Sequence, residues 1–317
     1  MARYRDHLPQ LGADVFLTDG GIETTLIFDD GLDLPEFAAF VLLEDADGRA
    51  VLARYFDRYA EVARRDGVGI VLETPTWRAN PDWAARLGYD EAQLDSVNRD
   101  AVELLLDTRR RFGDQTVVVS GCVGPRGDGY HPDRPMGSEE ATAYHAVQVG
   151  TFAGTEADLV TAITMTYPAE AVGVTRAAQA SGLAAVISFT VETDGRLPSG
   201  ETLAEAIAEV DAATSGYPAY YMVNCAHPTH FMSVLDGSAD WTGRLRGVRA
   251  NASRLSHDEL DEADELDSGN PEELAQDYVR LRRSLPGLTV LGGCCGTTHE
   301  HVSSISEACT RGMTGPR

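Results

Sequence analysis

Eight short apolar segments alternate with longer amphipathic segments along the whole chain, and few folds accommodate such an alternation. The apolar segments are rich in β-branched and aliphatic residues and are bounded by glycine or polar residues, as buried strands are. They are Val15–Thr18, Gly69–Leu72, Thr116–Val119, Leu159–Ile163, Ala184–Phe189, Ala219–Val223, Leu245–Ala250 and Leu288–Leu291.

Helical patterns fill the stretches between these segments. In Val51–Arg65 the apolar residues recur every three to four positions, which is typical of a helix with one buried face. Asn270 before Pro271 predicts a helix start, because asparagine caps a helix and proline suits its first turn. Further helices are predicted near residues 91–111, 138–154, 168–181, 201–214, 229–236 and 299–311.

Eight strands that alternate with helices predict an α/β fold, a (β/α)8 TIM barrel, as a single domain over residues 1–317. The seventh strand has the weakest pattern, because it contains Arg246 and Arg249. A doubly wound open sheet is the alternative. It usually has fewer strands and a GxGxxG motif after the first one, whereas the first strand here is followed by Asp19-Gly20-Gly21-Ile22-Glu23.

Charge and composition exclude several classes of function. The chain has 26 basic and 50 acidic residues, a net charge of −24, which argues against nucleic acid or an anionic membrane as a partner. All 26 basic residues are arginines, so a Schiff base on lysine and a Walker A loop are both excluded. The chain has no apolar run near 18 residues and begins without a signal-peptide core, so a cytoplasmic protein is expected.

The segment Ser256–Glu273 is the most acidic part of the chain, with nine carboxylates. It lies between the seventh strand and the last long helix but one. A solvated loop or short helix is the expected structure, and a moving lid over the site is the alternative.

Three of the five cysteines stand where predicted strands end, which is where the active sites of barrels form. Cys225 ends the sixth strand, and Cys294 and Cys295 end the eighth between glycines. Neighbouring residues of a regular strand point to opposite sides, but glycines relax this limit, so both sulfurs can face one point. Three thiolates suit Zn²⁺, and three protein ligands with an open fourth position are typical of catalytic zinc. The sequence therefore predicts a zinc site.

The other cysteines and nearby histidines have less specific interpretations. A redox dithiol is the alternative to zinc, but the chain has no CxxC motif. Cys122 and Cys309 are expected to be packing residues. Histidines near such a site more often cap helices or line the pocket than bind the metal, and those concerned are His227, His230, His299 and His301.

At these cysteines the chain resembles the homocysteine S-methyltransferase family over residues 15 to about 310. The resemblance rests on three motifs, which are Asp19-Gly20-Gly21, Asn224-Cys225 and Gly292-Gly293-Cys294-Cys295-Gly296-Thr297. The family consists of zinc-dependent (β/α)8 barrels that use S-methylmethionine, S-adenosylmethionine or betaine as methyl donor, and it includes the homocysteine-binding module of methionine synthase.

The resemblance implies a transferase that methylates a thiol, with homocysteine giving methionine as the expected reaction. The partners are then a small-molecule thiol and a methyl donor, and the zinc ligands are Cys225, Cys294 and Cys295. A thiol bound to zinc loses its proton and can attack a methyl group on a sulfonium or ammonium centre. Asp19 is implied to bind the thiol or to orient the donor, with capping of the turn after the first strand as the alternative.

Several positions depart from the family pattern, and they concern the acceptor rather than the metal. Members that use homocysteine usually have Glu-Thr after the fourth strand, with the glutamate on the amino group, whereas this chain has Ile163 and Thr164. A loop that often reads Pro-Asn contains Asn251 here, and a common tyrosine is replaced by Trp77. Trp77 would offer a flat face to a methylated cation, and ordinary packing is its alternative.

A cationic amino group needs an anionic partner when it is buried, and Ile163 cannot supply one. Glu73, at the end of the second strand, is the first candidate for this role, and Glu23 is the second. The alternative is that Glu73 bonds a neighbouring loop or an arginine. The full set of expected substrate-binding residues is Asp19, Gly20, Glu23, Glu73, Trp77, Thr164, Asn224 and Asn251.

Two other functions remain open from the sequence. One is methyl transfer to a different thiol or selenol, and the other is a non-catalytic zinc-binding protein. A chain of 317 residues lacks room for separate folate and cobalamin domains, which excludes a complete cobalamin-type methionine synthase. The sequence leaves a homo-oligomer open.

Overall fold

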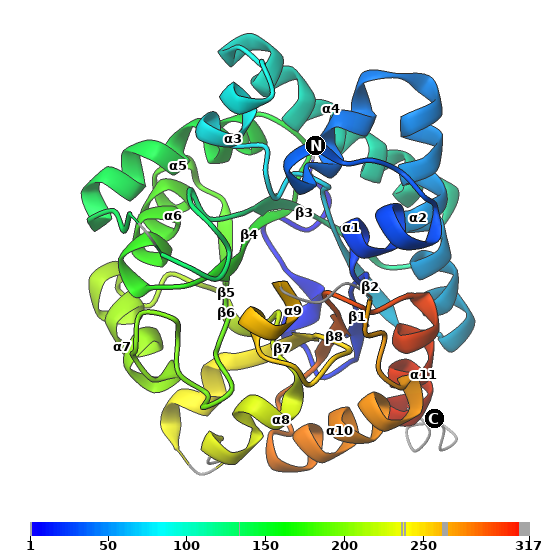
Figure 1. Ribbon diagram of the computed structural model, residues 1–317, viewed down its shortest axis with the longest axis vertical. Helices are drawn as coiled ribbons and strands as arrows, with labels where there is room; N and C mark the ends of the chain where they lie inside the picture. Colours follow the sequence, from blue (N-terminus) through cyan, green and yellow to red (C-terminus); the bar gives the residue numbers. More distant parts are fainter. Residues whose placement is uncertain (1, 133, 236, 238, 262–265, 311–317) are drawn as a thin grey trace.

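The computed structural model describes residues 2–132, 134–235, 237, 239–261 and 266–310 and shows a closed barrel of eight parallel strands in sequence order (Figure 1). Each strand pairs with the next, and β1 also pairs with β8, which closes the barrel. The strands are β1 (Phe16–Leu17), β2 (Gly69–Glu73), β3 (Val117–Val123), β4 (Leu159–Met165), β5 (Ala184–Phe189), β6 (Tyr220–Asn224), β7 (Leu245–Ala250) and β8 (Val290–Gly293).

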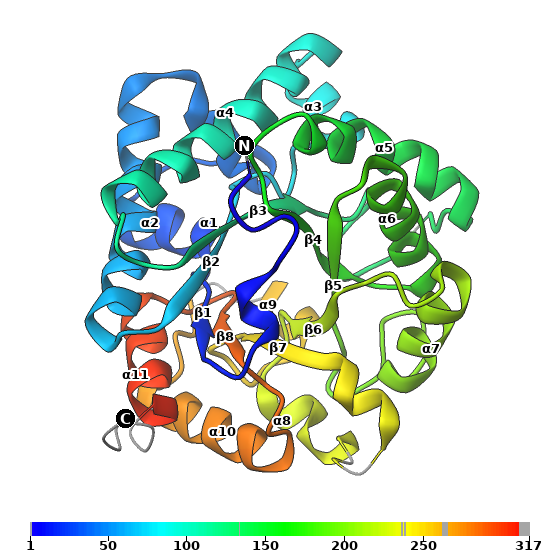
Figure 2. The same ribbon diagram turned by 180° about the vertical axis from the view of Figure 1, so that it is seen from behind.

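Helices surround the barrel on its outer side (Figures 1 and 2). Their bounds are α1 (Ile22–Thr24), α2 (Ala46–Asp66), α3 (Pro81–Arg86), α4 (Glu91–Arg111), α5 (Ser138–Ala153), α6 (Pro168–Ser181), α7 (Leu203–Thr214), α8 (Pro228–Phe231), α9 (His257–Asp261), α10 (Pro271–Ser284) and α11 (His299–Thr310). The predicted TIM barrel is therefore confirmed, and the open sheet is wrong. Among the described helices, none combines the length and the apolar character that crossing a membrane requires.

The helix ends follow from local sequence. Asp45 accepts a hydrogen bond from the backbone of Gly48 at the start of α2, and Gly67, at a φ of 69°, ends that helix in the left-handed region. Asn270 accepts hydrogen bonds from the backbone N–H groups of Glu272 and Glu273, which confirms the predicted start of α10. The helix predicted near residues 229–236 is shorter, because α8 ends at Phe231 and a 3-10 turn follows.

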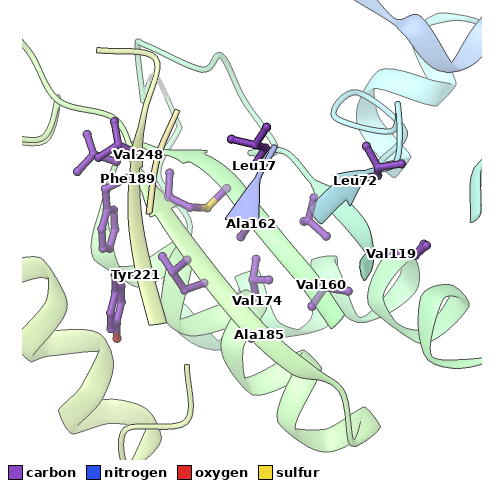
Figure 3. Packing of buried hydrophobic residues seen from close by; sticks show 14 of the residues in the cluster. Leu17, Leu72, Val119, Val160, Ala162, Val174, Ala185, Phe189, Tyr221 and Val248 are labelled. Atoms are coloured by element: carbon purple, nitrogen blue, oxygen red, sulfur yellow. The ribbon is translucent and has the colours of Figure 1, made fainter. Parts of the chain in front are cut away.

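The apolar residues of the strands form two separate packing layers. Val71 lies inside the barrel with Phe16 and Val118, whereas its neighbour Leu72 packs outward with the helices, because successive strand residues point to opposite faces. Figure 3 shows part of the outer layer, where Val160 and Ala185 of the sheet lie near Val174 of α6. These layers leave the ends of the strands as the place for polar residues.

The N-terminal segment crosses the bottom of the barrel (Figure 2) and is held there by a buried carboxylate. Asp158 accepts hydrogen bonds from the backbone N–H groups of Tyr4, at 2.8 Å, and Val119, at 2.9 Å. It also forms a salt bridge with Arg109, and both side chains are buried. Leu8 packs against the interior layer from below. The bottom is thus closed, and the opposite end is left for the site.

We expect Asp158→Ala to lower the free energy of unfolding by about 3–5 kcal/mol, because it leaves the charge of Arg109 buried without a partner. Asp100→Ala is the matched control, since Asp100 pairs with Arg49 in a salt bridge whose side chains are 41% and 39% exposed. Asp100→Ala should lower the free energy of unfolding by about 0.2–1 kcal/mol. Urea unfolding of both variants measures the difference, and equal losses would contradict the role given to Asp158.

Candidate active site

The three predicted metal ligands come together at the C-terminal mouth of the barrel. Cys225 follows β6, Cys294 and Cys295 follow β8, and their sulfur atoms all lie within 4.8 Å of one another. Cys225 and Cys294 are joined as a disulfide, which does not include Cys295. Among the described residues, this is the one group of three or more cysteine, histidine or carboxylate side chains close enough to hold a metal ion.

The backbone around the cysteines explains why both members of the pair reach the same place. A Cβ on Gly293 would collide with the side chain of Thr297, and one on Gly292 would collide with Thr18. Gly296 has a φ of 76°, which favours glycine. Cys225 itself adopts a φ of 52°, an unusual value for a residue with a side chain. The glycines therefore permit a turn that a regular strand would forbid.

Asn224 connects β6 to β4 next to the sulfur atoms. Its Oδ1 accepts from the backbone N–H of Thr164 at 2.9 Å, and its Nδ2 donates to the hydroxyl of the same residue at 2.9 Å. Ser188 also donates to Oδ1, at 2.6 Å. Thr164 needs this support, because a φ of 61° is strained for a β-branched residue. Asn224 thus ties the end of β4 to the end of β6, and its Nδ2 lies 4.0 Å from the sulfur of Cys294.

A small inner cavity of about 70 Å³ adjoins the sulfur atoms. Of the predicted residues, it is lined by Asp19, Gly20, Glu23, Glu73, Trp77, Thr164 and the three cysteines, together with Ile163 and Arg249. Cys122 is buried, as expected of a packing residue, but it also lines this cavity. Burial raises the pKa of its thiol well above the usual range, so it stays protonated.

Tyr130, in the loop between β3 and α5, also belongs to the site, although no sequence pattern indicated it. Its hydroxyl lies 3.5 Å from the sulfur of Cys295, and its ring stacks on His257 with centroids 4.0 Å apart. His257 opens α9, which lies over the mouth of the barrel in Figure 1, and its Nε2 contacts the carbonyl oxygen of Cys225 at 2.7 Å. The acidic segment thus contains the short helix that was expected, and its residues 262–265 lie outside the described part of the chain.

Arg249 occupies the centre of the site, between two carboxylates. It forms salt bridges with Glu73 and, at 2.8 Å, with Asp19, and all three side chains are at least 95% buried. It also donates to the carbonyl oxygens of Gly20, at 3.2 Å, and Gly293, at 3.0 Å. Burial raises the pKa of Asp19 and of Glu73, and the charge of Arg249 counteracts part of the rise.

The carboxylate of Glu73 is bonded to an arginine, which is the alternative interpretation of this residue, and its role toward a substrate amino group stays a prediction. Glu23, the second candidate, forms no salt bridge within 4 Å among the described side chains, and it faces the inner cavity. Burial, the largest effect, raises its pKa to about 7, and the negative charge of Asp19 adds to the rise.

Trp77 lines the inner cavity, but the cation on its ring belongs to the protein. The guanidinium of Arg78 lies 4.0 Å from the ring centroid of Trp77 and 3.7 Å from that of Trp83, between the two tryptophans. The packing interpretation of Trp77 therefore accounts for this contact. Asn251 is buried and does not line the inner cavity, and its Oδ1 accepts no hydrogen bond from the described residues.

The histidines near the motifs serve the local structure. His227 caps α8 by accepting from the backbone of Thr229, and His230 bonds the carbonyl oxygen of Arg254. His301 lies within hydrogen-bond distance of Thr298 and Ser268. This agrees with the expectation that such residues cap helices or support loops.

A larger outer cavity of about 380 Å³ adjoins the inner one and opens toward solvent. The two cavities meet beside Cys295, because both are lined by Glu23, Trp77, Tyr130 and Cys295. The outer cavity is mainly apolar, with side chains from the loops after β1, β2, β3 and β7. The mouth of the barrel therefore offers a narrow compartment at the sulfurs and a wider one above it.

Comparisons with known proteins agree with this description. A family model for homocysteine S-methyltransferase matches residues 16–309. The chain is similar in structure to the homocysteine methyltransferase MmuM from Escherichia coli in its metallated form, with 23% identity, a TM-score of 0.73, and coverage of 92% of this chain and 96% of that one. For the oxidized form of the same protein the identity is 24%, the TM-score is 0.73, and the match covers 92% of this chain and 95% of that one. No curated protein matches the chain. At these identities the structural likeness supports the fold.

We expect Glu23 to make the protein less stable as the pH rises. Its pKa is about 7 in the folded chain against 4.5 ordinarily, so the folded state binds the proton more tightly, and stability falls between about pH 4.5 and 7. Glu23→Gln should remove this loss of stability. Its free energy of unfolding should exceed that of the wild type by about 1–3 kcal/mol at pH 8 and should equal it at pH 4. Urea unfolding across this range measures it, and parallel curves for the two proteins would contradict the prediction.

Proposed function

The chain belongs to the homocysteine S-methyltransferase family and is an S-methyltransferase, and we propose that it uses zinc to methylate a thiol with a sulfonium or ammonium donor. The observation that carries the proposal is the group of three cysteine sulfurs, within 4.8 Å of one another, that faces the inner cavity. Its members come from two strand ends that are far apart in sequence, which a packing role alone does not require.

The donor set fits zinc. Zn–S bonds of about 2.3 Å place the sulfurs of a tetrahedral site roughly 3.8 Å apart, and the three sulfurs here all lie within 4.8 Å of one another. The cysteines must be reduced to bind the ion, so the disulfide between Cys225 and Cys294 represents the alternative state of the same residues. The related protein MmuM has been solved in both metallated and oxidized forms, which is consistent with two such states.

When bound, zinc would supply a lowered thiol pKa, so that the acceptor reacts as a thiolate at neutral pH. The acceptor sulfur then forms a bond to the methyl carbon while the bond between that carbon and the donor sulfur or nitrogen breaks. The electron pair of the broken bond remains on the donor, which leaves without charge on that sulfur or nitrogen. Cys225, Cys294 and Cys295 hold the ion in this reaction and are not nucleophiles.

The surrounding residues place and shield the reacting atoms. Asn224 holds the end of β4 against β6 beside the cysteines. Ile163 and the protonated Cys122 line the inner cavity and limit the water that reaches it. Tyr130, whose hydroxyl lies next to the sulfur of Cys295, closes the cavity on the side of the β3–α5 loop.

Homocysteine is the acceptor that the family favours, and methionine would be the product. Two observations favour a second candidate, a different thiol or a selenol: Ile163 offers no charge to an amino group, and Glu73 is already bonded to Arg249. The non-catalytic zinc-binding protein is not retained, because the chain belongs to a family of transferases.

The purified reduced protein should contain about one zinc ion per chain, and Cys295→Ser should remove both zinc and activity while the barrel stays folded. Cys309→Ser is the matched control, since Cys309 lies on α11 away from the sulfur group and should keep full zinc content. Elemental analysis with circular dichroism measures both. Full zinc occupancy in Cys295→Ser would refute the assignment.

Turnover should require only the zinc-loaded protein, a thiol and a methyl donor, without NAD, pyridoxal phosphate or ATP, because the chain lacks lysine and a phosphate-binding glycine motif. A matrix of thiols and selenols against sulfonium and ammonium donors, read by mass spectrometry of the methylated product, identifies the pair. Including both homocysteine and 4-mercaptobutyrate, which lacks the amino group, separates the two acceptor candidates. A strict need for one of the omitted cofactors would contradict the mechanism.

A further inference from the structure

The two cavities at the mouth of the barrel differ too much in size to serve the same purpose. The inner one measures about 70 Å³, while a water molecule in the liquid takes up about 30 Å³. It therefore holds little more than the reacting end of one substrate. The outer cavity, at about 380 Å³, has the size of a small-molecule site.

The charges that line the outer cavity favour a cation. Three carboxylates face it, from Glu23, Asp128 and Asp267, against one guanidinium, from Arg78. That guanidinium is already stacked between two tryptophan rings and donates to the carbonyl oxygen of Gly127 at 3.0 Å. Of the three carboxylates, Glu23 is the one that also lines the inner cavity, where the cysteines lie.

The rest of the lining is apolar and is partly exposed to solvent. Phe28 and Phe37 are 55% and 56% exposed, and they are two of the five large apolar side chains that the described part of the chain exposes. Both line the outer cavity, together with Ile27.

The backbone that presents Phe37 is strained. Glu36 and Phe37 have φ values of 55° and 54°, in the left-handed region that residues with side chains rarely adopt. Such strain costs stability and persists where the surrounding structure imposes it, often at ligand sites. The segment thus keeps an aromatic ring at the rim, where it is of little use to the core.

We propose that the outer cavity binds the methyl donor, that this donor is a sulfonium cation with a bulky apolar substituent, and that Glu23 is its counter-ion. The inference rests on the proposed function and adds the apolar substituent of the donor and the residue that attracts its charge. The apolar substituent lies against Ile27, Phe28 and Phe37, and the charged sulfur lies beside Glu23 where the two cavities meet. The methyl group is then directed at the acceptor sulfur in the inner cavity.

This placement also distinguishes the donor from its product. Transfer of the methyl group moves the electron pair of the broken bond onto the donor sulfur, so the sulfonium becomes a neutral thioether. The carboxylate of Glu23 attracts the first and has no charge to attract in the second. The site therefore releases the spent donor and rebinds a fresh one.

Titration calorimetry tests the proposal without any turnover. The probes are dimethyl(2-phenylethyl)sulfonium, its neutral product methyl 2-phenylethyl sulfide, and trimethylsulfonium, which has the charge without the apolar group. We expect the first probe to bind at least about tenfold more tightly than either of the others, because only it makes both the charge and the apolar contacts.

The variants separate the two contributions. Glu23→Gln should reduce the advantage of the sulfonium over its thioether to about twofold or less, because the charge contact is lost. Phe37→Ala, at an exposed position that the fold does not need, should weaken the phenylethyl probe and leave trimethylsulfonium unchanged. Glu36→Gln is the matched control, since Glu36 is 44% exposed, lies 3.8 Å from Arg86 and lines neither cavity. It should change none of the affinities.

Equal binding of the sulfonium and the thioether by the wild type would overturn the proposal, and so would failure of all three probes to bind. An unchanged preference in Glu23→Gln would overturn the role of that residue. These results do not depend on zinc content or methyl transfer, so they are distinguishable from failure of the proposed function.

Discussion

A single buried cation holds the mouth of the barrel together. Arg249 projects from β7 and bonds Asp19 after β1, Glu73 at the end of β2 and the carbonyl oxygen of Gly293 at the end of β8. Burying three ionised groups is costly unless each is paired, and here one guanidinium serves two carboxylates. Burial raises the pKa of both acids even though the charge of Arg249 opposes the rise, so the cluster fixes the positions of the strand ends more than it adds stability. Gly293, which precedes Cys294, accepts a hydrogen bond from Arg249, so the turn that carries the cysteines is attached to this cluster.

The barrel and the sulfur group were predictable because their signals are local. A strand shows as a short apolar run and a helix as a recurring apolar face, so seven of the eight strands needed no knowledge of their neighbours, and β7 formed despite its arginines. The adjacent Cys294 and Cys295 stand between glycines, and that pattern alone indicates an unusual turn. Short elements such as α1 and α3 escaped prediction, since so few residues show no period.

The partners of the charged side chains were not predictable in the same way. Glu73 and Arg249 are separated by 176 positions, and the sequence around Glu73 does not indicate its partner. Tyr130 lies in a loop without periodicity and reaches Cys295 through the fold. Arg249 and Arg78 occupy the two places that the sequence left to substrate cations, the carboxylate at Glu73 and the ring of Trp77.

The β3–α5 loop and α9, at the mouth of the barrel, contact the cysteines directly. His257 of α9 contacts the backbone carbonyl of Cys225 and stacks on Tyr130, whose hydroxyl meets the sulfur of Cys295. Since Tyr130 also lines both cavities, the outer cavity is connected to the sulfur group through direct contacts. Loss of either loop contact is therefore expected to disturb the positions of the three sulfur atoms, and a change in the sulfur group is expected to alter the shape of the entrance. Substitutions in these loops that would change the preference for a methyl donor are consequently limited to those that keep the contacts with Cys225 and Cys295.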